Sequence, residues 1–267
     1  MANVKPEDMI EGMLQAGARK AGLSVKDMLI RGFLSGVFLG YATTLAILAT
    51  VQTGLGIVGA MVFPVGFVMI VLLGLELVTG NFALIPLAVK DKRTRFGRLV
   101  FSWTWVLIGN LMGGVFYAFL YVIVVTKMGH IDPATIATAQ RIIEVAETKT
   151  LGYAQIGFDG TIAAFTSALL CNWMVTLGAV MAFTSSSTIG KITAMWLPIM
   201  TFFALGYEHA VVNMFLIPAG MMLGANITIA EGWLWNGFPV IAGNIVGGMI
   251  FTGFALYFTL RKGEGIN

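Results

Sequence analysis

Charged side chains are scarce in this chain of 267 residues. Asp, Glu, Lys and Arg together make up 11% of the sequence, whereas 58% of the residues are hydrophobic. A soluble globular domain has about 25% charged residues. The low charge content therefore excludes an ordinary soluble domain and predicts an integral membrane protein.

Cysteine and histidine are also rare, which excludes several kinds of site. The one cysteine is Cys171, so no intrachain disulfide can form. The two histidines, His130 and His209, lie far apart in the sequence, and no spacing of nucleophile and base is coherent. We therefore expect no metal, no cofactor and no enzymatic activity. The basic residues form no patch, so nucleic acid is not an expected partner.

Long apolar runs are abundant. Crossing a bilayer requires about 20 apolar residues. Two of the runs, 58–89 and 190–224, are too long for one straight helix, and each contains Gly, Pro or polar residues near its midpoint. We expect each of these two to consist of two half-helices joined by a break. The predicted fold is an all-α membrane protein with six transmembrane helices, at 32–54, 58–89, 100–126, 158–184, 190–224 and 234–260.

Positive charge is distributed unequally between the two ends of these spans. All but three of the 16 Lys and Arg residues fall on one side, the exceptions being Lys127, Arg141 and Lys149. By the positive-inside rule, both termini and the tail 261–267 are expected to be cytoplasmic, and the loop 127–157 extracytoplasmic. Segment 1–31 has apolar residues at helical spacing, which predicts a cytoplasmic amphipathic helix on the membrane or on a neighbouring subunit.

An internal repeat relates the two halves of the sequence. "ELVTGNFALIP" (76–86) matches "EHAVVNMFLIP" (208–218) at an offset of 132, and "GNLMGG" (109–114) matches "GNIVGG" (243–248) at an offset of 134. Each half, 32–126 and 158–260, contains three predicted spans, and an odd number makes the second half enter from the opposite side. This 3+3 inverted topology predicts a site near the midplane, where the two broken helices meet.

The matched segments supply residues that could stabilise the breaks, which we place at Thr79-Gly80-Asn81 and at Glu208-His209. We interpret Glu76 and Glu208 as acceptors for unpaired backbone N–H groups there. Asn81 and Asn213 are interpreted as caps of the half-helices that follow.

The "GNxxGG" segments of the two halves have the composition of faces that pack helix against helix. A pore-lining role for Asn110 or Asn244 is the alternative interpretation.

His209 is the residue that the repeat does not share. Glu208 and His209 are neighbours, and neighbours on a helix point in different directions, so we expect no ion pair between them. Glu76 repeats Glu208, which favours a structural role for the glutamates and a functional one for His209. Because the unperturbed pKa of histidine lies near neutrality, His209 could hold or relay a proton at the midpoint of a pore. The alternative is a neutral histidine whose hydrogen bonds are satisfied within the helix bundle.

The segments "ELVTGN", "CNWMV" (171–175) and "GYEHAVVNMFLIP", in this order, resemble the formate/nitrite transporter family of anion channels. The resemblance covers about 30–260 and implies an aquaporin-like fold, a homopentamer with one pathway through each protomer, and a bacterial or archaeal inner membrane. It places the central histidine of the family at His209, the loop threonine at Thr79 and the neighbouring asparagine at Asn172. It also places the apolar constrictions at Phe63, Phe67, Leu77, Val78, Val175 and Phe202.

One feature departs from the family pattern. A lysine is expected about 16 residues before Asn172, yet Gln155 and Ile156 occupy that region and the nearest lysine is Lys149. Either this stretch is locally rearranged, or the entrance lacks the positive charge.

The resemblance implies a channel for a small monovalent weak-acid anion, with formate first, then nitrite or hydrosulfide. Protons and the lipid bilayer are further expected partners. A neutral-solute pore and a non-transporting membrane receptor or scaffold are the alternatives.

Overall fold

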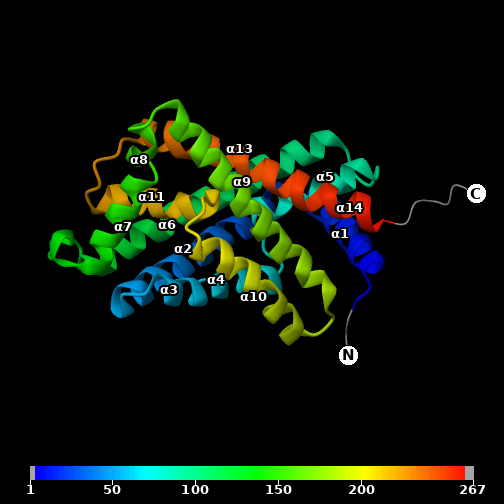
Figure 1. The fold of residues 1–267 in the computed structure, drawn as a ribbon, viewed down its shortest axis with the longest axis horizontal. Helices are drawn as coiled ribbons and strands as arrows, with labels where there is room; N and C mark the ends of the chain where they lie inside the picture. The colour runs from blue at the N-terminus through cyan, green and yellow to red at the C-terminus, as the bar shows by residue number, and fades with distance from the viewer. Residues whose placement is uncertain (1–3, 262–267) are drawn as a thin grey trace, which may run out of the picture.

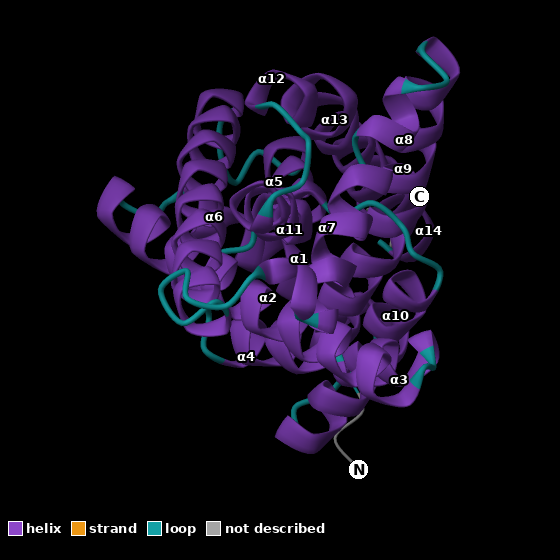
Figure 2. Ribbon diagram, turned by 90° about the vertical axis from the view of Figure 1, so that its left-hand side faces the viewer, coloured by secondary structure: helices purple, strands orange, loops and turns teal. Residues whose placement is uncertain are grey.

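The computed structural model describes residues 4–261, and over this range the chain is helical with no β-strand. Figures 1 and 2 show helices joined by short turns. The prediction of an all-α protein is confirmed. Of the expected tail 261–267, all but Arg261 lies outside the described residues, as do residues 1–3.

Within residues 4–261, four helical stretches are long and apolar enough to cross a membrane. They are α2 (Val25–Thr53), α6 (Phe96–Val125), α9 (Phe158–Met181, extended by η2, Ala182–Thr184) and a stretch over 229–260. The last stretch is built from five consecutive pieces: α12 (Ile229–Gly232), η3 (Trp233–Gly237), α13 (Phe238–Val246), η4 (Gly247–Phe254) and α14 (Ala255–Leu260), of which η3 and η4 are π-helical.

Shorter helices form the two runs that were expected to break. In the first run, α3 (Gly56–Val62) and α4 (Pro64–Leu72) precede α5 (Val78–Lys90). In the second, α10 (Thr188–Ala204) precedes α11 (Ala210–Leu223). Each interruption therefore lies between two apolar half-helices, as the length of the runs predicted.

The first interruption lies earlier than expected. Gly74 and Gly206 both have a positive φ, 65° and 69°, which ends α4 and α10 in a left-handed conformation that glycine adopts at little cost. The chain is then extended until α5 begins at Val78 and α11 at Ala210. Gly80, which we had placed at the break, lies instead in the first turn of α5.

Helix α1 (Pro6–Ala21) packs on its own chain. Its buried residues Met9, Ile10, Met13 and Leu14 contact α5, η2 and α14. Gly17 lets α1 approach closely, since a Cβ there would lie 2.2 Å from the carbonyl oxygen of Leu84. The expectation that this apolar face rests on the membrane or on a neighbouring subunit is therefore wrong, because the face is already covered.

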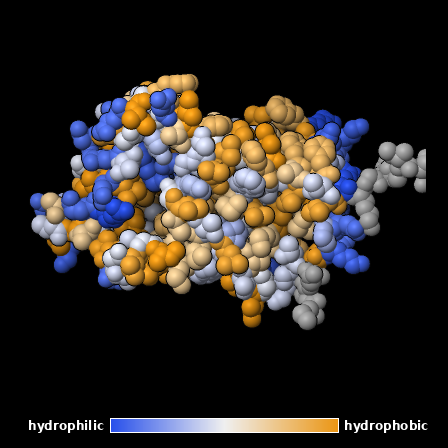
Figure 3. Space-filling model, in the orientation of Figure 1, coloured by the Kyte–Doolittle hydropathy of each residue, from blue (hydrophilic) through white to orange (hydrophobic). Residues whose placement is uncertain are grey.

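The segment between α6 and α9 folds over the opposite end of the molecule from α1 (Figure 1). It contains η1 (Pro133–Thr135), α7 (Ala137–Thr148) and α8 (Leu151–Ala154). Ile142 and Ala146 of α7 are buried in a cluster with Phe215 and Leu216 of α11. In Figure 3, hydrophilic residues gather at the two ends of the molecule and hydrophobic residues cover its middle, as expected for a protein that crosses a bilayer along its long axis.

Ion pairs hold α1 against the segment that follows α5. Arg93 contacts Glu11 of α1 at 2.7 Å and Asp91 at 2.8 Å, and Arg261 contacts Asp91. The hydrogen bond from Arg93 and a second one from Gln15 lower the pKa of Glu11 from 4.5 to about 2. A lowered carboxylate pKa stabilises the folded state above pH 4.5 and loses that contribution as the pH falls towards 2. Because the pair is exposed to solvent, the contribution is small.

We therefore predict that Glu11 stays ionised throughout the physiological range. In a ¹³C NMR titration, its carboxylate signal should stay constant from neutral pH down to about pH 4, whereas in Arg93→Gln it should titrate near the reference value of about 4.3. A midpoint near that reference value in the unmutated protein would contradict the pairing.

Candidate functional site

Two buried asparagines hold the starts of the half-helices. The backbone N–H of Val78 donates to Asn110 Oδ1 at 3.0 Å, and the N–H of Ala210 donates to Asn244 Oδ1 at 2.9 Å. The Nδ2 groups donate to the carbonyls of Glu76 and Glu208, at 2.9 and 3.0 Å. Each asparagine therefore satisfies both sides of the peptide segment that leads into a half-helix, so neither side chain is free to line a pore.

The glycines around these asparagines have the packing role that the sequence indicated. A Cβ at Gly109 would lie 3.1 Å from the Cα of Gly32, and one at Gly243 would lie 2.2 Å from the carbonyl oxygen of Phe165. The close approach of helices brings each asparagine within reach of a break. Sequence reasoning missed this second role, although the "GN" pair common to both halves was a signal for it.

The glutamates and the other asparagine pair interact differently from expectation. Asn81 Nδ2 donates to Glu76 Oε2 at 2.8 Å, and Asn213 Nδ2 donates to Glu208 Oε2 at 2.7 Å. The two asparagines are thus not helix caps, and the carboxylates accept from side chains instead of backbone N–H groups. The reason is that Asn110 and Asn244 already occupy the backbone positions.

Each buried carboxylate is paired with a lysine. Lys20 Nζ lies 2.9 Å from Glu76 Oε1, and Lys149 Nζ lies 2.8 Å from Glu208 Oε1. Both glutamates are only 2% exposed, and an unpaired charge at such a position is strongly destabilising. The lysines come from α1 and from the C-cap of α7.

Tyr153 and Asn236 complete the surroundings of Glu208. The Tyr153 hydroxyl donates to Oε1 at 3.0 Å, and Asn236 Nδ2 donates to Oε2 at 3.1 Å. Burial, followed by the charge of Glu208, raises the pKa of the Tyr153 phenol, so the hydroxyl keeps the proton that it donates. Neither residue was identified from the sequence.

Lys149 is the lysine nearest to the position, around residue 156, where the family pattern expects one. Gln155 and Ile156 are exposed after α8, whereas Lys149 points inward to Glu208. A positive charge is therefore present beside Glu208, seven residues earlier than Ile156.

His209 links the two halves of the molecule. It is the N-cap of α11, where its Nδ1 accepts from the backbone N–H of Val212 at 3.2 Å. Its Nε2 lies 3.0 Å from Thr79 Oγ1 in α5. Because Nδ1 accepts, a neutral ring carries its proton on Nε2 and donates it to Thr79. The structure records no ion pair between Glu208 and His209 within the described residues, as the sequence predicted.

A cavity of about 250 Å³ reaches His209 from the side of α7. Arg141 and Lys149 lie along it, with Phe202, Val212 and Thr43 among the other lining residues. The ring of Phe202 stacks on the imidazole with centroids 5.6 Å apart. His209 thus lies buried in an apolar wall, in a cavity that also reaches two cationic side chains.

The remaining predicted pathway residues lie close to this point. Asn172 Nδ2 donates to the carbonyl of Thr79 at 3.1 Å and to that of Asn244 at 2.6 Å. Phe202 contacts Phe63 edge to face, with centroids 5.6 Å apart. All six expected constriction residues belong to one buried hydrophobic cluster, namely Phe63, Phe67, Leu77, Val78, Val175 and Phe202.

Taken together, the apolar helices, the paired interruptions and the buried polar centre define a multi-pass membrane protein of the transport class. The family model "Formate/nitrite transporter" matches residues 7–258. The chain belongs to the formate/nitrite transporter family, whose named members are transporters and channels and not enzymes.

Individual relatives agree with this assignment. The protein is 33% identical to "Formate channel BtFdhC" of Bacillus thuringiensis, over 98% of this chain and 98% of the relative. A solved "FNT family ion channel" superposes with a TM-score of 0.80 at 27% identity, covering 94% of this chain and 98% of that one. A "Pentameric formate channel with formate bound" shares the fold, with a TM-score of 0.69 at 24% identity over 88% and 96%.

We predict that Asn244→Ala and Asn110→Ala destabilise the protein to a similar extent. Either substitution leaves the N–H of Ala210 or Val78 and nearby carbonyls buried without partners, at about 1–3 kcal/mol for each group. Thermal unfolding in detergent should show a lower Tm for both variants, whereas Asn226→Ala in an exposed loop should melt like the unmutated protein. An unchanged Tm for Asn244→Ala would contradict the capping role.

Proposed function

We propose that the protein is a transmembrane channel for a small monovalent weak-acid anion, with formate as the first candidate and nitrite or hydrosulfide as alternatives. The observation that carries this proposal is the buried Thr79–His209 contact, which lies where two half-helices meet and borders a cavity with Lys149 and Arg141. The names of relatives that are formate channels support the choice of formate.

In this proposal the chain crosses the membrane six times in a 3+3 inverted arrangement, with two of the crossings made by pairs of half-helices. The matched contacts of Asn110 and Asn244 support the repeat. Repeat 32–126 and repeat 158–260 flank the extracytoplasmic loop 127–157. We place both termini in the cytoplasm of a bacterial or archaeal cell, because the basic residues gather on the side of α1. Like the pentameric relative, the protein would assemble as a homopentamer.

Entry of the anion would depend on the basic mouth of the cavity. Cationic side chains in a concave, apolar wall raise the local concentration of anions. Glu208 neutralises part of the charge on Lys149, since their atoms are 2.8 Å apart. Anions would therefore be attracted without being bound tightly enough to block the pathway.

At the midpoint, Thr79 and His209 would replace water around the anion. If the Nε2–H of His209 donates to Thr79 Oγ1, the threonine hydroxyl is left to donate its own proton in a hydrogen bond to the substrate. Asn172, which is hydrogen-bonded to the carbonyl of Thr79, would hold this segment in place.

Beyond this point the apolar cluster around Phe63 and Phe202 would exclude hydrated ions. Burial disfavours a charged solute, so a weak acid would cross such a constriction most readily in its neutral form. Proton coupling through His209 is part of the proposal. A proton could reach Nδ1 only if the hydrogen bond to Val212 N–H opened.

For His209→Asn, we predict slower formate flux into liposomes and an altered pH profile, because the link to Thr79 and the titratable ring are both lost. His130→Asn is the matched control, since His130 is exposed in the loop after α6. An unchanged rate together with an unchanged pH profile in His209→Asn would refute the role of His209.

The substrate is tested by measuring formate, nitrite, hydrosulfide and glycerol flux side by side at several pH values. We expect formate to be the fastest of the four and to speed up as the pH falls, because the neutral acid becomes more abundant. Glycerol flux above that of every anion would refute the anion channel in favour of a neutral-solute pore.

A further inference from the structure

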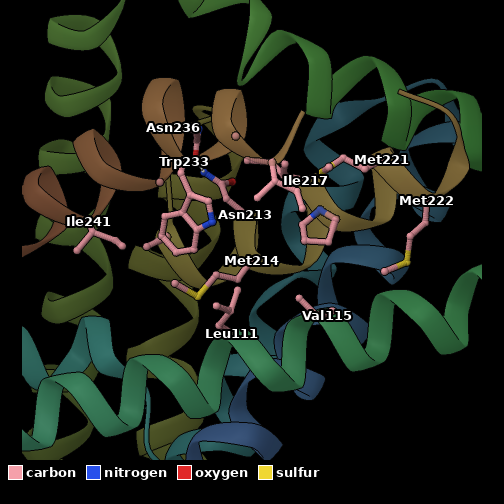
Figure 4. Close-up of a pocket in the computed structure, with 15 residues that line it drawn as sticks. Leu111, Val115, Asn213, Met214, Ile217, Met221, Met222, Trp233, Asn236 and Ile241 are labelled. Atoms are coloured by element: carbon pink, nitrogen blue, oxygen red, sulfur yellow. Dashed lines mark hydrogen bonds between the residues drawn. The ribbon is translucent and has the colours of Figure 1, made fainter. Parts of the chain in front are cut away.

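A second and larger cavity lies away from the pathway. This groove has a volume of about 370 Å³ and runs between α6 and the segment 229–241, with α11 as its floor. Figure 4 shows Leu111 and Val115 on one side, Trp233 and Ile241 on the other, and Met214 and Ile217 between them. Its lining contains no charged side chain, so the groove does not suit an anion.

Helix α11 separates this groove from the cavity at His209. Met214, Ile217 and Met221 face the groove, whereas Val212 and Leu216 face the cavity. Within each set the residues are three or four positions apart, the helical spacing that places side chains on one face, so the two sets mark two different faces of α11. Whatever fills the groove therefore packs on the back of α11, the helix that His209 caps.

The groove lies beside a position at which the two halves of the sequence differ. In the first half, the indole of Trp103 packs edge to face on Phe82 and donates to the carbonyl of Asn81. At the offset of 134 that aligns "GNLMGG" with "GNIVGG", the residue corresponding to Trp103 is Gly237. The ring of Trp233 lies against Gly237, 2.5 Å from where a Cβ would be, and the remaining space is left open.

The position and length of the groove favour an occupant from the membrane. It lies between two helices that are long enough to cross a membrane, and its rim includes the exposed side chain of Met222. The lining face of α11 extends from Ala210 to Met222, a rise of about 18 Å at 1.5 Å per residue. This length is close to one leaflet, or half of the hydrocarbon thickness of about 30 Å.

We propose that this groove binds one acyl chain of a membrane lipid from the leaflet on the side of α7. The Met, Leu, Ile and Trp side chains offer the chain an apolar and adaptable surface. Soluble partners cannot reach this depth. A neighbouring copy of the chain is the other conceivable occupant, and the experiment below distinguishes the two.

The test uses liposomes that contain a phospholipid with a photoreactive diazirine in the middle of one acyl chain. After illumination, mass spectrometry of the full-length protein should locate labels within 210–223. Val115→Phe fills the groove and should abolish those labels. Val124→Phe makes the same change at an exposed site on the same helix and should leave them unchanged.

Met221→Trp fills the groove from α11 and provides a second variant in case Val115→Phe folds poorly. Labels within 210–223 that vanish in a folded groove-filling variant support the proposal. Absence of labels in the unmutated protein, or labels that persist in both filled variants, would overturn it. Dissociation of the oligomer by both filled variants, without labelling of the unmutated protein, would assign the groove to a neighbouring copy. Anion flux is measured separately, so this test does not depend on the proposed function.

Discussion

The backbone groups exposed at two helix interruptions are the constraint on which the rest of this structure depends. Inside an apolar bundle, an N–H or carbonyl group without a partner costs free energy, and breaking a helix creates several of them at once. Asn110 and Asn244 satisfy these groups from neighbouring helices. Glycine-lined helix contacts bring the two asparagines close enough to do so. Because these backbone groups are hydrogen-bonded, Thr79 Oγ1 and His209 Nε2 can lie 3.0 Å apart where the two half-helices meet.

Charge balance around the interruptions connects the core with the peripheral helices. Glu76 and Glu208 are buried, and each forms an ion pair with a lysine that lies outside the apolar helices. These lysines are Lys20 in α1 and Lys149 at the end of α7. These ion pairs therefore connect α1 to the segment before α5, and α7 to the segment before α11. These connections place Lys149 in the cavity that leads to His209. The same ion pair thus stabilises a buried carboxylate and positions a lysine in the cavity that reaches His209.

Much of this arrangement could be predicted from the sequence, and the errors have physical causes. Run length and the repeat indicated interrupted helices, and the resemblance placed Thr79 and His209 at the centre. The position of the first interruption was wrong because Gly74, not Gly80, adopts the left-handed conformation. The predicted hydrogen-bond partners of Asn81 and Asn213 were wrong because side-chain contacts between distant helices are not visible in local sequence. The pairing of Lys149 with Glu208 was missed because the position of Lys149 depends on how α7 folds over α11.

The fixed surroundings of His209 give the account its central claim. Because Val212 N–H occupies Nδ1, a neutral ring carries its proton on Nε2, directed at Thr79. The most direct test is ¹⁵N solid-state NMR of the protein in lipid bilayers with labelled histidine, using His209→Asn to assign the signal. The account predicts a neutral His209 ring at neutral pH with a protonated Nε2 and an unprotonated Nδ1. A ring with its proton on Nδ1, or with protons on both nitrogens, would contradict it.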